Sequence, residues 1–290
     1  MKKCLECESC FDSEHWKCPK CGFQPQSSEG FQIHCPEISK SQDGYNPDHF
    51  DFLFALEDRN FWFRSRNKLI QWVLRSIMKA PSSFLEIGCG TGYVLRGIQS
   101  TMPTVALAGS EIFVEGLRYS RERLPGVTLM QMDALKLPFV EEYECIGAFD
   151  VLEHIADDVG VLRQIHQALK PLGFAVFTVP QHKFMWSNAD ESACHERRYS
   201  RGELERKCLD AGFRVVKSTS FVSLLLPIMY LSRRLNSSGP ESLSNANELN
   251  VNPFLNEILY VVLILEHLLI RIGVSLPLGG SRLVVCQKPT

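Results

Sequence analysis

Apolar residues change their spacing in a regular way between positions 83 and 220. Short runs rich in β-branched and aromatic residues alternate with segments in which apolar side chains recur every three or four positions. Runs of the first kind are typical of buried strands, and segments of the second kind are typical of amphipathic helices. The pattern predicts strands over 83–87, 105–109, 127–131, 145–149, 173–179 and 213–218, and helices over 93–100, 114–122, 159–169 and 200–211.

The segments on either side of this core have other patterns. Residues 49–79 show helical spacing, and residues 221–235 and 253–272 are strongly apolar helix candidates. Residues 236–250 are rich in Ser, Asn and Glu and are expected to be mobile. A final strand is predicted over 282–287, where the chain would return to the sheet.

Strands that alternate with helices at this spacing predict an α/β fold. We expect a Rossmann-like, doubly wound and mostly parallel sheet of seven strands, with a small N-terminal zinc ribbon and C-terminal apolar helices. The predicted units are a ribbon over 1–23, a polar linker over 24–48 and one domain over 49–290, which has its core at 80–220, an apolar helical insertion at about 221–275 and a last strand at about 281–288.

Composition and charge narrow the class of protein. The 290 residues are 45% hydrophobic, which is enough for a full core, and the formal net charge of −2 provides no basic field that would attract nucleic acid. The N-terminus has no apolar signal region, and no run of 18 uncharged apolar residues occurs. We therefore expect a reducing, cytoplasmic compartment rather than secretion.

Five of the eleven cysteines lie within the first 21 residues. Cys7 and Cys10 form one C-x-x-C pair, and Cys18 and Cys21 form a second. Two such turns supply the four tetrahedral thiolate ligands of a structural Zn²⁺. Cys4 with Cys7 also fits the spacing, but the first two pairs make the symmetrical set and are our prediction. The segment resembles a zinc ribbon, and a closed site of this kind serves folding or docking rather than catalysis.

The sequence FLEIGCGTGYVL begins at Phe84 and joins the first core strand to the first core helix. Glu86 precedes Gly88 by two positions, and Gly90 and Gly92 complete a G-x-G-x-G spacing. A dinucleotide site would place its third glycine one residue later, and an acidic residue here would repel a phosphate. The stretch therefore predicts a ligand that approaches the backbone closely and carries an ammonium group.

The stretch resembles motif I of the class I S-adenosylmethionine-dependent methyltransferases, and further segments continue the likeness in family order. SEI at 110–112 resembles the ribose-binding acid at the end of the second strand. QMDALKLPF at 131–139 is similar to the adenine-binding loop, and FDVLEHIADD at 149–158 to the segment after the fourth strand. The resemblance implies S-adenosylmethionine as cofactor, held by Glu86, Gly88, Cys89, Gly90, Gly92, Glu111, Ile112, Asp133, Ala134, Leu135, Phe149 and Asp150.

The segment DVLEHI also looks like its counterpart in ubiquinone-biosynthesis and small-RNA O-methyltransferases. There, carboxylates and histidines can hold a divalent ion, such as Mg²⁺, that activates a hydroxyl. The likeness implies Glu153, His154 and His195 as catalytic candidates, with His182 as a further histidine after the fifth strand. The alternative is that Glu153 and His154 only shape a helix start or line the cofactor pocket.

The resemblance also favours an apolar acceptor. Similar apolar helices occur in bacterial methyltransferases whose substrates are lipid-linked or large and apolar, and segments like NFWFRSRN, with Trp62 and Arg66, fold over their active sites as lids. The alternative is that the aromatic residues Phe61, Trp62 and Phe63 pack in the core or against a helix. We expect O-methylation of a lipid-linked saccharide, an isoprenoid or another apolar metabolite. The C-terminal helices are either buried in a core or homodimer interface, or lie on the membrane surface.

Two other functions remain open from the sequence. Zinc ribbons precede this fold in bacterial ribosomal-RNA methyltransferases, but the first 23 residues balance four lysines with four acidic residues, which makes a poor phosphate grip. A non-catalytic scaffold that keeps the cofactor fold is the second alternative. The intact glycine loop, Glu111 and Asp133 argue against it.

Overall fold

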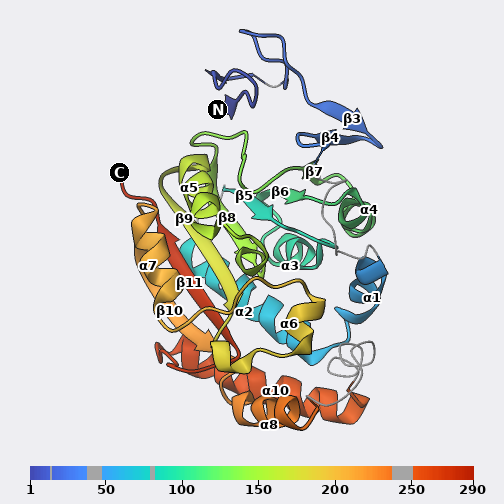
Figure 1. Ribbon diagram of the computed structural model, residues 1–290, viewed down its shortest axis with the longest axis vertical. Coiled ribbons are helices and arrows are strands. Elements are labelled where there is room, and N and C mark those ends of the chain that lie inside the picture. The colour runs from blue at the N-terminus through green and yellow to red at the C-terminus, as the bar shows by residue number, and fades with distance from the viewer. Residues whose placement is uncertain (14, 38–47, 79–81, 237–250) are drawn as a thin grey trace.

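A nine-stranded sheet forms the centre of the computed structural model, which describes residues 1–13, 15–37, 48–78, 82–236 and 251–290 (Figure 1). The strand order is β10-β11-β9-β8-β5-β6-β7-β4-β3. Its strands are β3 (Gln26–Ser28), β4 (Phe31–Ile33), β5 (Ser83–Ile87), β6 (Ala106–Glu111), β7 (Thr128–Gln131), β8 (Tyr143–Phe149), β9 (Leu169–Pro180), β10 (Arg214–Phe221) and β11 (Ser281–Gln287). A separate antiparallel pair joins β1 (Lys2–Lys3) to β2 (Cys10–Phe11).

Most of the large sheet is parallel. Strands β4, β7, β6, β5, β8 and β9 run in one direction, whereas β11 is antiparallel to both β9 and β10. The strand β3 is antiparallel to β4 at the opposite edge. The carboxyl ends of β5, β6 and β8 therefore lie at one edge of the sheet, where open α/β folds bind their ligands.

Helices cover both faces of the sheet, as doubly wound folds require. On one face α5 and α7 pack through residues such as Val161 and Leu204, and on the other α2, α3, α4 and α10 pack through Leu69, Leu95 and Leu263. The helices are α1 (Asp48–Leu56), α2 (Phe61–Ile77), α3 (Tyr93–Thr101), α4 (Val114–Arg123), α5 (Asp158–Ala168), α6 (Asn188–Ser192), α7 (Glu203–Asp210), α8 (Leu226–Asn236) and α10 (Pro253–Arg271).

The sheet has nine strands rather than the seven that were predicted, and residues 24–48 are not only a linker. The strands β3 and β4 come from this segment. Phe31 is 3% exposed and packs in the core, and the backbone of β4 pairs with β7. Without β4, the edge of β7 would leave backbone donors and acceptors unpaired. Two inward-facing apolar residues among Gln, Ser and Gly were too short a signal to predict a strand.

The remaining elements follow the predicted pattern with shifts at their ends. The strand β5 has the predicted bounds, but β9 begins at Leu169, which pairs with Tyr143 of β8. The strand β10 continues to Phe221, paired with Ser281, so α8 begins five residues later than predicted. The expectation that residues 236–250 are mobile falls almost wholly outside the described residues.

Candidate active site and metal centre

The glycine turn after β5 leaves backbone open to a ligand. Gly88, Gly90 and Gly92 all have positive φ angles, of +66°, +51° and +76°. A Cβ on Gly88 would lie 2.5 Å from a methyl carbon of Val151, so only glycine fits there. A Cβ on Gly90 would meet nothing within 4 Å. The space beside Gly90 can therefore receive a ligand at van der Waals distance from the backbone.

Glu86 lies under this turn as a buried carboxylate. It is 3% exposed, and its Oε2 has no hydrogen-bond partner among the described residues. Burial raises its pKa well above the ordinary value, Arg66 opposes that rise, and Glu57 and Glu111 add to it. Three carboxyl groups that act on one site favour a cationic ligand over a phosphate. The ammonium ligand predicted from Glu86 fits this environment.

Glu111 ends β6 and is tied to the same turn. Its carboxylate accepts hydrogen bonds from the backbone N–H groups of Gly90 at 2.9 Å, Ile112 at 2.8 Å and Phe113 at 3.3 Å. Burial raises the pKa of Glu111 although these three donors oppose it. The carboxylate is thereby held beside the backbone of Gly90, where the hydroxyls of a sugar could reach it.

The loop after β7 adds a third wall at the same edge. Asp133 accepts a hydrogen bond from the backbone N–H of Leu135 at 2.9 Å, which fixes a tight turn around the buried Ala134. Cys89 in the glycine turn faces Ser120 of α4, with 3.7 Å between Sγ and Oγ. The predicted cofactor residues on β5, β6 and β7 therefore belong to neighbouring loops of one edge.

A buried network that the sequence did not indicate supports the glycine turn. Thr91 donates to Glu57 at 2.6 Å, and Arg123 of α4 donates to Thr91 at 2.5 Å and also pairs with Glu57. Arg123 is also bonded to the carbonyl of Phe54 at 2.9 Å. The network ties the segment that follows α1 to the turn, and no spacing in the sequence links these positions.

Helix α2 brings Arg66 to the end of β8. Its guanidinium lies 3.1 Å from a carboxylate oxygen of Asp150, donates to the carbonyl of Phe149 at 3.4 Å and stacks over Trp62 at 4.7 Å. Asp150 has a φ of +58°, a conformation that costs energy for a residue with a Cβ and often marks functional sites. Arg66 and Asp150 therefore form an ion pair at the same edge of the sheet as the glycine turn, which we call the cofactor edge.

A second cluster lies after β8. Glu153, His154 and His195 each offer one ligand atom, and these atoms all lie within 4.8 Å of one another. The two imidazole rings meet edge to face at 4.7 Å. Desolvation of its ring, followed by the nearby His195, lowers the pKa of His154, although the residue as a whole is exposed. His182 lies elsewhere, stacked on Phe184 at 5.0 Å.

The cluster contains a carboxylate that lacks a partner. Glu153 is fully buried, and neither of its oxygens has a hydrogen-bond partner among the described residues. Burial, and next the charge of Asp150, raise its pKa well above the ordinary value, whereas Arg66 and Arg198 oppose the rise. The ionised form of such a carboxyl group readily takes up a proton or binds a cation, because no hydrogen bond from the described residues stabilises its charge.

Asp190 orients His195, and the sequence analysis missed it. Its Oδ1 lies 2.9 Å from Nδ1 of His195 and accepts from Arg198 at 2.7 Å. Burial alone would raise the pKa of Asp190, but the hydrogen bond from His195 and the charge of Arg198 hold it below the ordinary value. A carboxylate on Nδ1 leaves Nε2 as the basic nitrogen of the ring. Asp190 had no motif around it that could have revealed this role.

The N-terminal segment gathers four cysteines, but not the predicted four. Cys4, Cys7, Cys18 and Cys21 lie together, whereas Cys10 is exposed at the start of β2. The pairing of β2 with β1 turns Cys10 away, while Cys4 is 3% exposed in a small apolar cluster. The preference for Cys10 over Cys4 was wrong because both C-x-x-C turns satisfy the local spacing.

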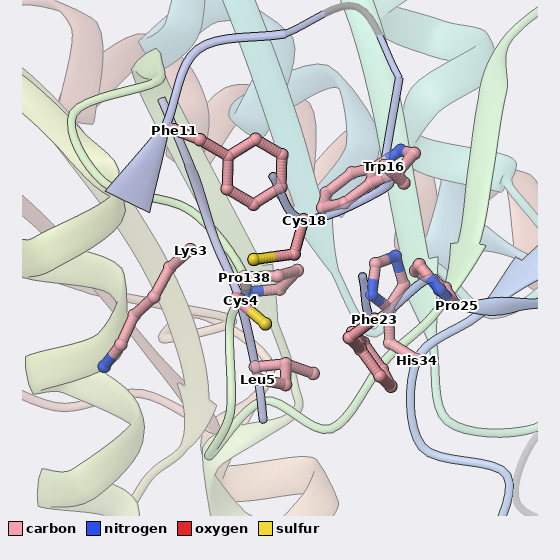
Figure 2. Close-up of a pocket in the computed structure, with 10 residues that line it drawn as sticks. All are labelled: Lys3, Cys4, Leu5, Phe11, Trp16, Cys18, Phe23, Pro25, His34 and Pro138. Atoms are coloured by element: carbon pink, nitrogen blue, oxygen red, sulfur yellow. The ribbon is translucent and has the colours of Figure 1, made fainter. Parts of the chain in front are cut away.

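The geometry of these sulfurs fits one zinc ion. Cys4 and Cys21 are 3.5 Å apart, and Cys7 and Cys18 are 3.7 Å apart. A tetrahedron with Zn–S bonds of about 2.3 Å places its sulfurs about 3.8 Å apart. Figure 2 shows Cys4 and Cys18 at a cavity of about 10 Å³ that Trp16 and His34 also line.

Comparisons with known proteins support the resemblance to methyltransferases. The model of a family described as "Methyltransferase domain" matches residues 56–218. Trans-aconitate 2-methyltransferase from Acidovorax sp. strain JS42 is 25% identical over 134 residues, which cover 44% of this chain and 52% of that protein. Malonyl-[acyl-carrier protein] O-methyltransferase from Halalkalibacterium halodurans is 25% identical over 111 residues, which cover 36% of this chain and 41% of that protein.

A solved structure shares the fold. Phosphoethanolamine N-methyltransferase 2 from Haemonchus contortus, solved with S-adenosyl-L-methionine, matches with a TM-score of 0.51 at 17% identity. The match covers 77% of this chain and 53% of that one. Identity this low shows the fold alone, and the chain spans about half the length of the curated relatives it matches.

Proposed function

The chain belongs to the methyltransferase domain family, and from that premise we propose that it is an S-adenosylmethionine-dependent methyltransferase that methylates a hydroxyl oxygen of an apolar or lipid-linked small molecule. The observation that carries the proposal is the pairing of His195 with Asp190 beside Glu153, at the carboxyl edge of the sheet. Transfer to a hydroxyl needs a base, because a neutral alcohol is a weak nucleophile.

The cofactor would be held by the acidic residues of the cofactor edge. The partnerless Oε2 of Glu86 fits the ammonium group, and Glu111 fits the ribose hydroxyls. Asp133 fits the adenine amino group, with Ala134 and Leu135 beside the ring. When bound, S-adenosylmethionine supplies a methyl group on a positively charged sulfur. The open space at Gly90 supports this fit, because it lets a ligand contact the backbone.

The protein's own residues then manage the proton. In the transfer that the cofactor would supply, the acceptor oxygen would form a bond to the methyl carbon, and the electron pair of the broken carbon–sulfur bond would stay on sulfur. The hydroxyl proton passes to Nε2 of His195, and Asp190 stabilises the imidazolium that forms. Arg198 keeps Asp190 ionised and in place. These groups account for proton removal without a metal.

Glu153, His154 and His195 also form a donor set for a divalent ion. Two imidazoles and one carboxylate suit Mn²⁺, Fe²⁺ or Zn²⁺ better than Mg²⁺, which prefers oxygen ligands. A metal there would lower the pKa of a bound hydroxyl, so that the reaction would depend less on His195 as a base. Sensitivity of activity to a chelator distinguishes the two routes.

The acceptor is expected to be apolar because exposed aromatic side chains lie on the chain segment that leads to Asp190 and His195. Phe184 and Trp186, on the segment that leads from β9 to α6, are 57% and 39% exposed. Phe184 lies 5.0 Å from the ring of His182 and 5.9 Å from that of Tyr230. Exposed aromatic rings on the segment that carries Asp190 and His195 suit a substrate with a hydrophobic body.

The first test is methyl transfer from radiolabelled S-adenosylmethionine into a lysate that is then separated into lipid, glycan, protein and RNA fractions. Label in lipid or glycan supports the proposal and provides the acceptor for kinetics. Label in RNA would replace the proposed acceptor with a nucleic acid. Label in none of the fractions would contradict the proposed acceptor class.

The second test uses the acceptor so obtained. His195→Gln should lower kcat by about 100-fold to 10,000-fold, the usual contribution of a general base, with little change in KM for the cofactor. Asp190→Asn should lower kcat and alter its pH profile. His166→Gln is the matched control, because His166 lies in the last turn of α5 and packs against Phe213. Unchanged kcat in His195→Gln would refute the assigned base.

A further inference from the structure

Helix α10 is apolar on two opposite faces. One face is buried through Leu263 and Ile270, and the other presents large side chains to solvent. Within the described part of the chain, α10 is the helix whose length and composition would allow it to cross a membrane. Its most apolar stretch of 18 residues has a mean hydropathy of 1.7, and 28% of that stretch is buried. Six of the exposed apolar residues, spaced three or four positions apart, form one stripe along α10 and its C-cap: Phe254, Ile258, Val261, Leu265, Leu268 and Ile272.

Buried polar contacts hold α10 along the protein. The amide of Asn256 accepts from the backbone N–H of Phe61 at 2.8 Å and donates to the carbonyl of Arg59 at 3.0 Å. Glu266 is fully buried and accepts from the backbone N–H groups of Ser223 at 2.6 Å and Leu224 at 2.8 Å. To cross a bilayer, α10 would have to break these contacts. The helix therefore lies along the surface of the fold.

Helix α8 continues the same surface. Leu224, just before α8, and Ile228 and Leu231 of α8 are exposed and repeat the helical spacing, and Figure 1 shows α8 and α10 together at the lower end of the molecule. The ring of Tyr230 lies 5.9 Å from that of the exposed Phe184. We call the exposed apolar side chains of α8 and α10, with Phe184, the apolar platform.

Cations lie along one border of the platform, and the acids of α10 are paired or buried. The sequence of α8 contains no acidic residue, Glu257 of α10 pairs with Arg64, and Glu266 is buried. Cations lie at its border: Arg271 and Lys217 over the ring of Trp72, and Lys68 over the ring of Tyr260. A second copy of this chain would need opposite charges on the same surface to pair by symmetry. Anionic lipid headgroups match a border of cations directly.

We propose that the apolar platform docks on the surface of a membrane that contains anionic phospholipid. The exposed stripe of α10 and the residues of α8 enter the headgroup–acyl boundary, and the border cations contact lipid phosphates. Phe184 belongs to the same chain segment as Asp190 and His195, so docking brings that segment to the bilayer. Membrane binding does not depend on methyl transfer, and its test can fail or succeed separately from the proposed function.

The experiment measures co-sedimentation of the full chain with vesicles of phosphatidylcholine alone and of phosphatidylcholine mixed with phosphatidylglycerol. The wild type should bind the mixed vesicles, and raised salt should weaken that binding. Leu265→Glu should lower the vesicle partition coefficient by about tenfold or more, because a charge replaces a Leu side chain that enters the bilayer when the platform docks. Leu209→Glu on α7 is the matched control, since Leu209 is 56% exposed and Leu265 is 54% exposed.

Equal loss of binding in Leu265→Glu and Leu209→Glu would overturn the proposal, as would wild-type protein that stays in the supernatant with both vesicles. The oligomeric state is measured on the same samples by light scattering. A wild-type dimer that does not bind vesicles, and that Leu265→Glu converts to a monomer, would assign the platform to a second copy of the chain instead. Circular dichroism checks that both variants fold.

Discussion

At the scale of single residues, the cofactor edge keeps an acid in a place that costs stability. Glu86 is 3% exposed with a partnerless oxygen, and burial raises its pKa. Such a group destabilises the free protein when it ionises. Its presence is understandable if a cationic ligand compensates for the burial, as the ammonium group of S-adenosylmethionine would.

Glu86→Gln is therefore expected to raise the free energy of unfolding at neutral pH by about 1–3 kcal/mol, because a neutral amide avoids the cost of ionising a buried carboxyl, about 1.4 kcal/mol for each unit by which folding raises the pKa. The wild-type Glu86 contributes most stability in acid, below the unfolded pKa of about 4.3, and loses it as pH rises through the raised folded pKa. The advantage of the variant should therefore be small at pH 4 and grow toward neutrality. Urea unfolding at several pH values measures it.

The same variant should bind S-adenosylhomocysteine about 10-fold to 100-fold more weakly in calorimetry, because a charged hydrogen bond is lost. Glu115→Gln, at a half-exposed position of α4, is the control and should alter neither quantity. A Glu86→Gln protein with lower stability at neutral pH would show that the charge of Glu86 is already balanced in the free protein. Unchanged affinity would refute the ammonium assignment.

At the scale of elements, the N-terminal ribbon illustrates how pairing selects among equivalent motifs. Cys4 and Cys10 stand at equal distances on either side of Cys7, and each makes a C-x-x-C with it. Pairing of Lys3 with Cys10 in the β1–β2 hairpin leaves Cys10 exposed and places Cys4 among Phe11 and Cys18. The strand pairing, and not the motif, decides which thiol joins the cysteine cluster.

Cys4→Ser should lose the zinc, whereas Cys10→Ser should retain about one equivalent, since a tetrahedral structural site needs all four thiolates. Metal content by mass spectrometry of the purified proteins measures this. The two variants are matched in chemistry and differ by six positions. Zinc retained in Cys4→Ser but lost in Cys10→Ser would restore the ligand set that the sequence suggested.

At the scale of the whole molecule, the ribbon is an added unit with its own small core. Its buried residues Cys4, Phe11 and Cys18 form a cluster separate from the two clusters that flank the sheet. It contacts the domain through a backbone hydrogen bond of 3.0 Å from Lys3 to Pro138 and through the ring of Trp16 against Phe139. We therefore expect the ribbon to depend on a metal more than the domain depends on the ribbon.

Removal of the metal with a chelator should raise amide hydrogen exchange in the first 23 residues and leave the central strands β5, β8 and β9 protected. The reason is that a segment this small buries few apolar side chains of its own, whereas the sheet is buried between two layers of helices. Exchange followed by mass spectrometry compares the two regions in one sample. A simultaneous loss of protection in β5 would mean that the ribbon and the sheet unfold as one unit.

The sequence by itself determined the α/β class, the position of almost every core strand and the acids around the glycine turn, because these depend on local spacing and on short motifs. It also indicated that Glu153, His154 and His195 belong together, through a family likeness. The cysteine cluster was predicted with three of its four members correct.

Tertiary structure alone decided the rest, because it depends on contacts between residues far apart in the chain or on which partner covers a surface. The pairing of β4 with β7 added two strands to the sheet, and the hairpin exchanged Cys4 for Cys10. Asp190 reaches His195 only through the fold of the loop after β9. The apolar composition of α10 is compatible with a buried helix and with an exposed one. Its packing against α2 and against the segment before α8 gives the helix one buried face and one exposed face.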